Sequence, residues 1–174
     1  MQVTSDATPA YRLVNDKVER IDRSLFYVKP DLLVILDRLD LVDGTKAALS
    51  ARFQIFNEDT RGIGAVTGTT FTIKRPHAGL VARTHAYGST PVTALRALDL
   101  PPEEGSFPFI EVTSGAAAQH TLLTVVAAHP TGGEPGQLDV RETAQGWTIR
   151  GSHSGQNIAI DIDRARAALP FSSV

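Results

Sequence analysis

The sequence predicts an all-β protein, an antiparallel two-layer β-sandwich with little helix. Short runs rich in Val, Ile, Thr and aromatic residues recur along the whole chain, and Gly, Pro, Asp or Asn separate them. Amphipathic patterns long enough for a large helix are missing from the sequence. A chain of 174 residues is long enough for one hydrophobic core and too short for two stable ones. We therefore expect a single domain over residues 1–174.

Taken in chain order, the strand-like segments are short and regularly spaced. Segment 92–98 alternates well enough for a strand, but Thr90 and Pro91 before it also suit a helix start, so both readings stay open. Residues 163–169 predict a short helix that ends at Pro170. Strands are predicted at 11–14, 18–28, 32–39, 47–56, 64–67, 70–74, 80–85, 109–113, 121–128, 138–142, 147–150 and 158–162.

Two predicted strands are apolar at nearly every position. Residues 32–36 and 122–128 lack the alternation expected of a sandwich strand with one wet face. Both faces of these strands must therefore be covered. Either the loops at 57–64 and 129–136 fold over the outer face, or that face docks against another domain or a second copy of the chain. A homodimer is the simplest form of the second alternative.

Composition excludes several classes of protein. A net charge of −2 argues against a nucleic-acid binder. The chain has no cysteine, so disulfides and thiolate metal sites are excluded. No apolar run is long enough to cross a bilayer, and the first residues do not resemble a signal peptide. The compartment stays undetermined, and a periplasmic or secreted longer protein is compatible with the sequence.

The polar residues do not assemble into a known catalytic or metal-binding motif. No two histidines have a metal-ligand spacing, so we expect neither a metal nor a cofactor. His77 and His85 could approach each other across neighbouring strands. Asp37 follows the most apolar strand, where a charge needs a partner, so we expect a pair with an Arg or Lys. The binding candidates are His77, Arg83, His85 and Tyr87.

Two further polar stretches are interpreted as turns. Glu103 and Glu104 lie in a Pro-Pro-Glu-Glu-Gly loop and predict a solvated turn. The Gly151–Gly155 stretch carries His at the centre where a hydrolase elbow would carry Ser, so we interpret it as a polar hairpin loop. One Trp and three Tyr are a thin supply of aromatic residues for a sugar-stacking platform.

The N-terminal quarter of the chain resembles a known family. Ser5-Asp6-Ala7 leads to Ala10-Tyr11, and Arg23-Ser24-Leu25-Phe26-Tyr27-Val28-Lys29-Pro30-Asp31 leads to an apolar strand ending in Asp37-Arg38. This pattern resembles the C-terminal β-sheet part of heparinase II/III-like polysaccharide lyases, with Ser5 in place of the family's usual Gly. The matching residues, to which a structural role is assigned, are Asp6, Tyr11, Arg23, Lys29, Asp31, Asp37 and Arg38.

The resemblance implies a domain of a larger enzyme. Lyases of this family join an N-terminal α/α toroid to β-sandwich domains and cleave uronic-acid-containing glycans, such as glycosaminoglycans or alginate, by β-elimination. The resemblance therefore implies a supersandwich-like C-terminal domain that scaffolds the toroid and works on an acidic polysaccharide. The family's His-Gly-His-x-Asp-like segment is not in this sequence, so no catalytic residue is carried over and the chain alone is not expected to be catalytic.

Two functions of other classes remain as alternatives. The chain could be a free-standing carbohydrate-binding module, which binding to a glycan array would reveal. It could also be a small independent enzyme that uses a His with a Tyr or Arg, which the release of unsaturated uronides would reveal.

Overall fold

The computed structural model describes residues 1–101 and 104–165, and most of them lie in strands. The elements in chain order are β1 (Gln2–Asp6), α1 (Thr8–Arg12), β2 (Val18–Val28), β3 (Leu32–Leu41), β4 (Ser50–Gln54), β5 (Ile63–Thr67), β6 (Thr70–Lys74), β7 (Ala78–Ala86), β8 (Val92–Ala97), β9 (Pro108–Thr113), β10 (Gln119–Pro130), β11 (Gln137–Thr143), β12 (Gly146–His153) and β13 (Gln156–Asp163).

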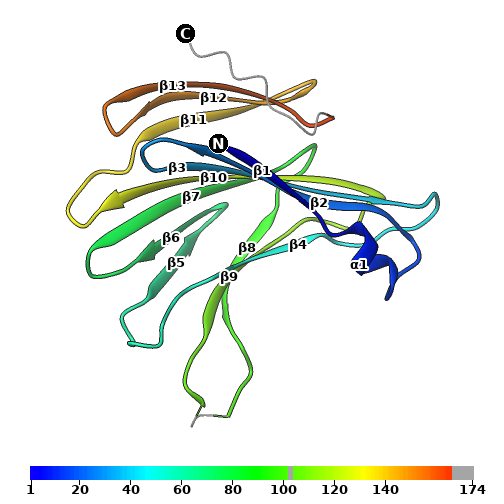
Figure 1. Cartoon of the computed structure of the whole chain (residues 1–174), viewed down its shortest axis with the longest axis horizontal. Coiled ribbons are helices and arrows are strands. Elements are labelled where there is room, and N and C mark those ends of the chain that lie inside the picture. Colours follow the sequence, from blue (N-terminus) through cyan, green and yellow to red (C-terminus); the bar gives the residue numbers. More distant parts are fainter. Residues whose placement is uncertain (102–103, 166–174) are drawn as a thin grey trace.

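The strands form three antiparallel sheets stacked in layers (Figure 1). The central sheet has the strand order β1-β2-β3-β10-β7-β6-β5. One face of it packs against β11-β12-β13 and the other against β4-β9-β8. The predicted all-β sandwich is confirmed, but with three layers where the sequence predicted two.

The third layer explains the two strands without alternation. Strands β3 and β10 are neighbours at the centre of the middle sheet, with Ile35 opposite Thr124. Val34 and Val125 point into the core beneath β11–β13, whereas Ile35 and Val126 point into the core above β4, β9 and β8. Other sheets of the same chain thus cover both faces of β3 and β10. The sequence analysis had predicted cover by loops or by a second domain or copy of the chain. The apolar pattern therefore no longer argues for a homodimer.

The N-terminal segment corrects two local predictions. Residues 11–14 were expected to be a strand, but Tyr11 lies in the helix α1, which begins at Thr8 with Pro9 in its first turn. The apolar residues Leu13 and Val14, which suggested a strand, follow the helix and are exposed. The edge strand β1 was not predicted, because its five residues are all exposed and show no alternation.

Four further local predictions concern segment 92–98, the connection at residues 29–31, the helix at 163–169 and the turn at 103–104. Segment 92–98 is the strand β8. Lys29-Pro30-Asp31 forms the predicted tight connection between β2 and β3. In the predicted helix at 163–169, Asp163 ends strand β13, and residues 166–169 lie outside the described part. Glu104 lies in the turn predicted there, whereas Glu103 also lies outside the described part.

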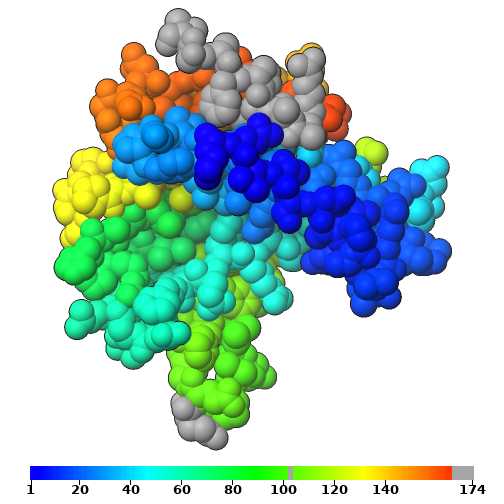
Figure 2. Space-filling view, in the orientation of Figure 1, coloured from blue at the N-terminus to red at the C-terminus, as the bar shows by residue number. Residues whose placement is uncertain are grey.

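Two features of the surface are visible in the space-filling view. The N-terminal residues of β1 and α1 lie along one side of the body, and the β8–β9 hairpin extends away from it as a separate projection (Figures 1 and 2). Among the described residues, no helix has the length and apolar character needed to cross a bilayer.

Candidate functional site

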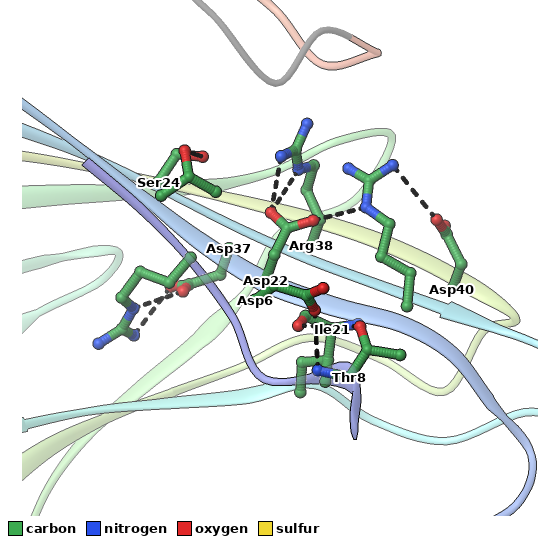
Figure 3. A network of polar contacts seen from close by, with 11 residues as sticks. Asp6, Thr8, Ile21, Asp22, Ser24, Asp37, Arg38 and Asp40 are labelled. Carbon is green, nitrogen blue, oxygen red and sulfur yellow. Dashed lines mark hydrogen bonds and ion pairs between the residues drawn. The ribbon is translucent and has the colours of Figure 1, made fainter. Parts of the chain in front are cut away.

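Three of the residues that carry the family resemblance, Arg23, Asp37 and Arg38, form ion pairs on β2 and β3 (Figure 3). The antiparallel register sets Arg23 opposite Asp37 and Asp22 opposite Arg38. Because successive side chains of a strand point to opposite faces, these two pairs lie on opposite faces of the central sheet. Asp37 and Arg38 are therefore adjacent in sequence but serve different partners.

The Arg23–Asp37 pair faces the β4 side of the central sheet. The guanidinium of Arg23 donates two hydrogen bonds, from Nε to Oδ1 at 2.5 Å and from Nη2 to Oδ2 at 3.0 Å. These bonds raise the pKa of Arg23. The guanidinium also lies 5.7 Å from the centre of the Phe53 ring. The expectation that Asp37 pairs with a basic residue is confirmed, and its partner is Arg23.

The Asp22–Arg38 pair faces the β11–β13 side and is more deeply buried. Arg38 reaches Oδ1 of Asp22 from Nε at 2.8 Å and from Nη2 at 2.7 Å. Arg20 donates to the other oxygen of Asp22 at 2.6 Å and lies 3.7 Å from Asp40. The carboxylate of Asp22 thus accepts bonds from two guanidinium groups, which offsets the cost of its burial.

Asp6 anchors the start of the helix α1. Its Oδ1 accepts a hydrogen bond from the backbone N–H of Thr8 at 2.9 Å, and the hydrogen bonds with Thr8 lower the pKa of Asp6. The Thr8 hydroxyl in turn accepts the backbone N–H of Ile21 at 2.9 Å. Asp6 therefore connects the N-terminal segment to β2 through Thr8 and Ile21 and touches neither buried ion pair directly.

A cleft of about 270 Å³ opens beside this network, between the N-terminal segment and the edge strand β4. We call it the Arg23 cleft. Its lining includes Tyr11 and Arg23 of the resembling pattern, together with Arg52 from β4. Its further lining includes Ser5, Ser50, Asp22, Asp37 and Arg38. Several residues of the resembling pattern thus line one cavity. The sequence analysis assigned them a structural role and did not predict this cavity.

Lys29 and Asp31 lie at the other end of β2 and β3. Asp31 accepts the Ser154 hydroxyl with both oxygens at 2.9 Å. Nε2 of His153 lies 2.7 Å from Asp31 Oδ1 but is poorly aligned for a hydrogen bond. The backbone N–H of Gly136 donates to Nδ1 of His153 at 3.2 Å. The predicted hairpin turn is confirmed at Ser154 and Gly155, whereas His153 itself is buried at the end of β12.

Arg83 and His85 line a second depression, a groove of about 780 Å³ between β7 and the edge strand β11. The Arg83 guanidinium donates to the carbonyl oxygen of Leu138. Burial, and then the charge of Arg83, lower the pKa of His85, which favours the neutral form of its imidazole. The groove also contains Glu134, Asp139 and Arg150, which leaves no clear excess of either charge.

The other two binding candidates lie outside this groove. The Tyr87 hydroxyl donates to the carbonyl oxygen of Ala144 at 2.8 Å, and its ring packs edge-on against Trp147. His77 is exposed in the turn between β6 and β7. His77 and His85 thus lie at opposite ends of one strand, about 26 Å apart at the strand rise of about 3.3 Å per residue. They do not approach each other as the sequence had indicated.

Sequence reasoning missed Asp22, Arg20 and Arg52. Asp22 and Arg20 belong to an alternating strand in which charged residues normally point to water, so only the register with Arg38 reveals their role. Arg52 is distant in sequence from the resembling pattern and carries no local signal. Within residues 1–101 and 104–165, no group of three or more potential ligands forms a metal site.

Comparisons with known proteins find a match in structure but not in sequence. No protein-family model matches the chain, and no curated protein matches it. A crystal structure of heparinase III matches with a TM-score of 0.58 and 12% identity, over 83% of this chain and 23% of the other. Heparan sulfate lyase HepC from Pedobacter heparinus matches with a TM-score of 0.57 and 12% identity, over 85% of this chain and 24% of the other.

A further heparinase III structure matches with a TM-score of 0.64 and 12% identity, over 93% of this chain and 25% of the other. The chain spans about a quarter of the length of each of these proteins. At this level of identity the match concerns the fold. The chain therefore has the fold of one part of heparinase III, and the resemblance to the C-terminal β-sheet part of heparinase II/III-like lyases is confirmed at the level of the fold.

Proposed function

We propose that this chain is the C-terminal β-sandwich of a heparinase II/III-like polysaccharide lyase, where it supports a catalytic α/α toroid. The observation that carries the proposal is the structural match, which covers most of this chain and only about a quarter of the lyases. The resemblance of the sequence pattern around Arg23, Asp37 and Arg38 to the family supports the proposal as well. In the fold these residues form ion pairs between β2 and β3.

The chemistry of the Arg23 cleft supports a scaffolding role. β-Elimination needs a base to remove the proton next to the carboxyl group and an acid to assist the leaving oxygen. The described lining of the cleft holds no histidine, the carboxylates of Asp22 and Asp37 are bonded to guanidinium groups, and the Tyr11 hydroxyl could serve as only one of the two groups. Guanidinium groups stay protonated and cannot act as the base. We therefore assign the elimination to the full-length protein.

The proposal is tested by assaying the purified chain with heparin, heparan sulfate, chondroitin and alginate. We expect no rise in ultraviolet absorbance from unsaturated uronides with any of them. The reading frame that contains the codon for Met1 provides the second test, and we expect it to encode a helical toroid upstream. Turnover that disappears when a single His or Tyr of this chain is replaced would contradict the proposal.

A free-standing carbohydrate-binding module is the alternative, and the aromatic residues argue against it. Such modules stack flat rings on sugars, but Trp147 is buried in the core and Tyr87 packs against it. The Tyr27 hydroxyl bonds the carbonyl oxygen of Pro30. Tyr11 is then the one open ring among the Trp and Tyr residues, all of which the structure describes.

A further inference from the structure

We propose that residues 168–172 bind along the free edge of strand β11 and add a fourth strand to the β11–β13 layer. These residues belong to the segment 166–174, which lies outside the described part of the chain. The inference goes beyond the scaffolding role and does not depend on it, because it assigns an occupant to the groove between β7 and β11. It rests on the unpaired edge of β11, on the apolar floor beneath that edge, and on the sequence of the segment.

Strand β11 has a free edge that faces the groove. Within the described residues it pairs with β12 alone, so its other side has no neighbouring strand. The carbonyl oxygen of Leu138 points to that side, where it accepts a hydrogen bond from the guanidinium of Arg83 on β7. Backbone groups of a strand alternate between its two sides, so those of Val140 and Glu142 point the same way as those of Leu138. An unpaired row of this kind is a ready site for an added strand.

The floor of the groove is apolar beneath this edge. The side chains of Leu138 and Val140 point from β11 toward the central sheet and join the core there. A small cavity of about 50 Å³ lies between them and a set of apolar residues of the central sheet, Val81, Val125 and Ala127. This cavity adjoins the groove, because Leu138 and Val140 line both. A strand added at the edge therefore directs every second side chain onto an apolar surface.

The sequence of the segment has the pattern that such a strand needs. Leu169 and Phe171 alternate with Pro170, and Ala168 and Ser172 flank them. At this edge the residues that bond to β11 are also those whose side chains face the floor, as Leu138 and Val140 do, and Leu169 and Phe171 suit both requirements. Pro170 then faces away from β11, where its missing N–H costs no hydrogen bond. The proline also disfavours a helical conformation at Leu169.

The described part of the chain ends within reach of this edge. The backbone N–H of Arg164 donates to the carbonyl oxygen of Gln145 at 3.0 Å, and the Arg164 guanidinium lies 4.2 Å from the centre of the Tyr87 ring. Gln145 lies in the turn between β11 and β12. Three residues beyond Ala165 span about 10 Å at about 3.3 Å each, enough to pass this turn. The segment then runs antiparallel to β11, and the four strands have the spatial order of a Greek key.

The test is hydrogen exchange of the full chain, followed by nuclear magnetic resonance at two neighbouring amides of β11. The amide of Val140 faces the free edge, whereas that of Arg141 faces β12 and serves as the internal reference. Phe171→Asp places a charge against the apolar floor and should raise the exchange rate at Val140 about tenfold or more, with no change at Arg141. Ser172→Asp is the matched control, since it places the same charge on the outward face, and it should leave both rates unchanged.

A second measurement adds the segment as a separate molecule. A chain that ends at Ala165 keeps every residue of the three cores. Its Val140 amide should exchange faster than in the full chain, and a synthetic peptide of residues 166–174 should restore the slow exchange. The same peptide with Phe171→Asp should not restore it.

Three results would overturn the proposal. The first is equal exchange at Val140 in the full chain and in the chain that ends at Ala165. The second is an equal effect of Phe171→Asp and Ser172→Asp. The third is protection of Val140 that rises with protein concentration, which would assign the edge to a second copy of the chain. None of them bears on the lyase proposal, because hydrogen exchange involves no cleavage and no toroid.

Discussion

Among single residues, Asp22 and Asp40 belong to one ion network and differ in burial. The Asp22 side chain is 9% exposed and that of Asp40 is 30% exposed. Asp22→Asn removes the carboxylate from the buried guanidinium of Arg38, and we expect it to lower the free energy of unfolding by about 3 kcal/mol. Asp40→Asn, the control, should cost less than about 1 kcal/mol. Urea denaturation measures both, and similar losses would show that burial does not set the strength of these pairs.

An exposed pair is predicted to respond to pH. Two hydrogen bonds from Arg75 hold the pKa of Asp59 at about 2, below its ordinary value of 3.8. Because the folded state depresses this pKa, the contribution of Asp59 to stability is present above pH 3.8 and is lost as the pH falls toward 2. A carboxyl-carbon titration should give the low midpoint. Arg75→Gln should return it toward 3.8, and an unchanged midpoint would assign the shift to another cause.

The sequence predicted that Asp37 has a basic partner, but it could not identify the partner. Burial of the strand end was enough to require a counter-charge. The choice of Arg23 for Asp37 and of Asp22 for Arg38 depends on the register of β2 against β3. A shift of one residue would exchange the faces of both pairs. Arg52 of β4 lines the same cleft as Arg23 of β2, and no local pattern reveals that these distant segments meet.

Among the elements, strand β3 offers a direct test of burial on both faces. Val34 points toward the β11–β13 layer and Ile35 toward the β4-β9-β8 layer. Val34→Asp and Ile35→Asp should each lower the unfolding free energy by more than about 4 kcal/mol, because each buries a carboxylate without a counter-charge. Val92→Asp on the exposed strand β8 is the control and should change stability by less than about 1 kcal/mol. Near-native melting of either core variant would contradict the double cover.

The strands themselves were largely predictable, because a half-buried strand alternates and Gly, Pro and Asp mark its ends. The failures have physical reasons. In α1, apolar residues of high strand propensity follow Pro9, yet Leu13 and Val14 remain in water. Strand β1 is held at the edge of the sheet by pairing with β2, although all five of its residues are exposed. In both cases tertiary contacts overrode the local pattern.

The number of layers could not be predicted, because it depends on pairs distant in sequence. Strand β10 lies beside β3, with Leu123 opposite Leu36. The chain crosses between layers after β3, β4, β7, β9 and β10, and loops make each of these crossings. The continuous apolar strands did require cover on both faces. They carried no sign that the cover would come from the same chain.

For the whole molecule, the β11–β13 layer is predicted to be indispensable. It buries the apolar side of β2, β3 and β10 beneath Leu138, Trp147 and Ile149. A chain that ends at Gly133 would expose that surface, which is larger than soluble monomers usually tolerate. We expect the shortened chain to bind the dye ANS strongly, to self-associate and to unfold without a cooperative transition.

The matched control removes residues 1–5 instead, which belong to the exposed edge strand β1 and leave the three cores intact. This variant should keep cooperative unfolding and bind little dye. Fluorescence, sedimentation and calorimetry compare the two variants with the full chain. A shortened chain that stays monomeric, binds no dye and melts cooperatively would contradict the prediction. It would mean that the central sheet and the β4-β9-β8 layer form a complete fold, and that β11–β13 is an independent addition to it.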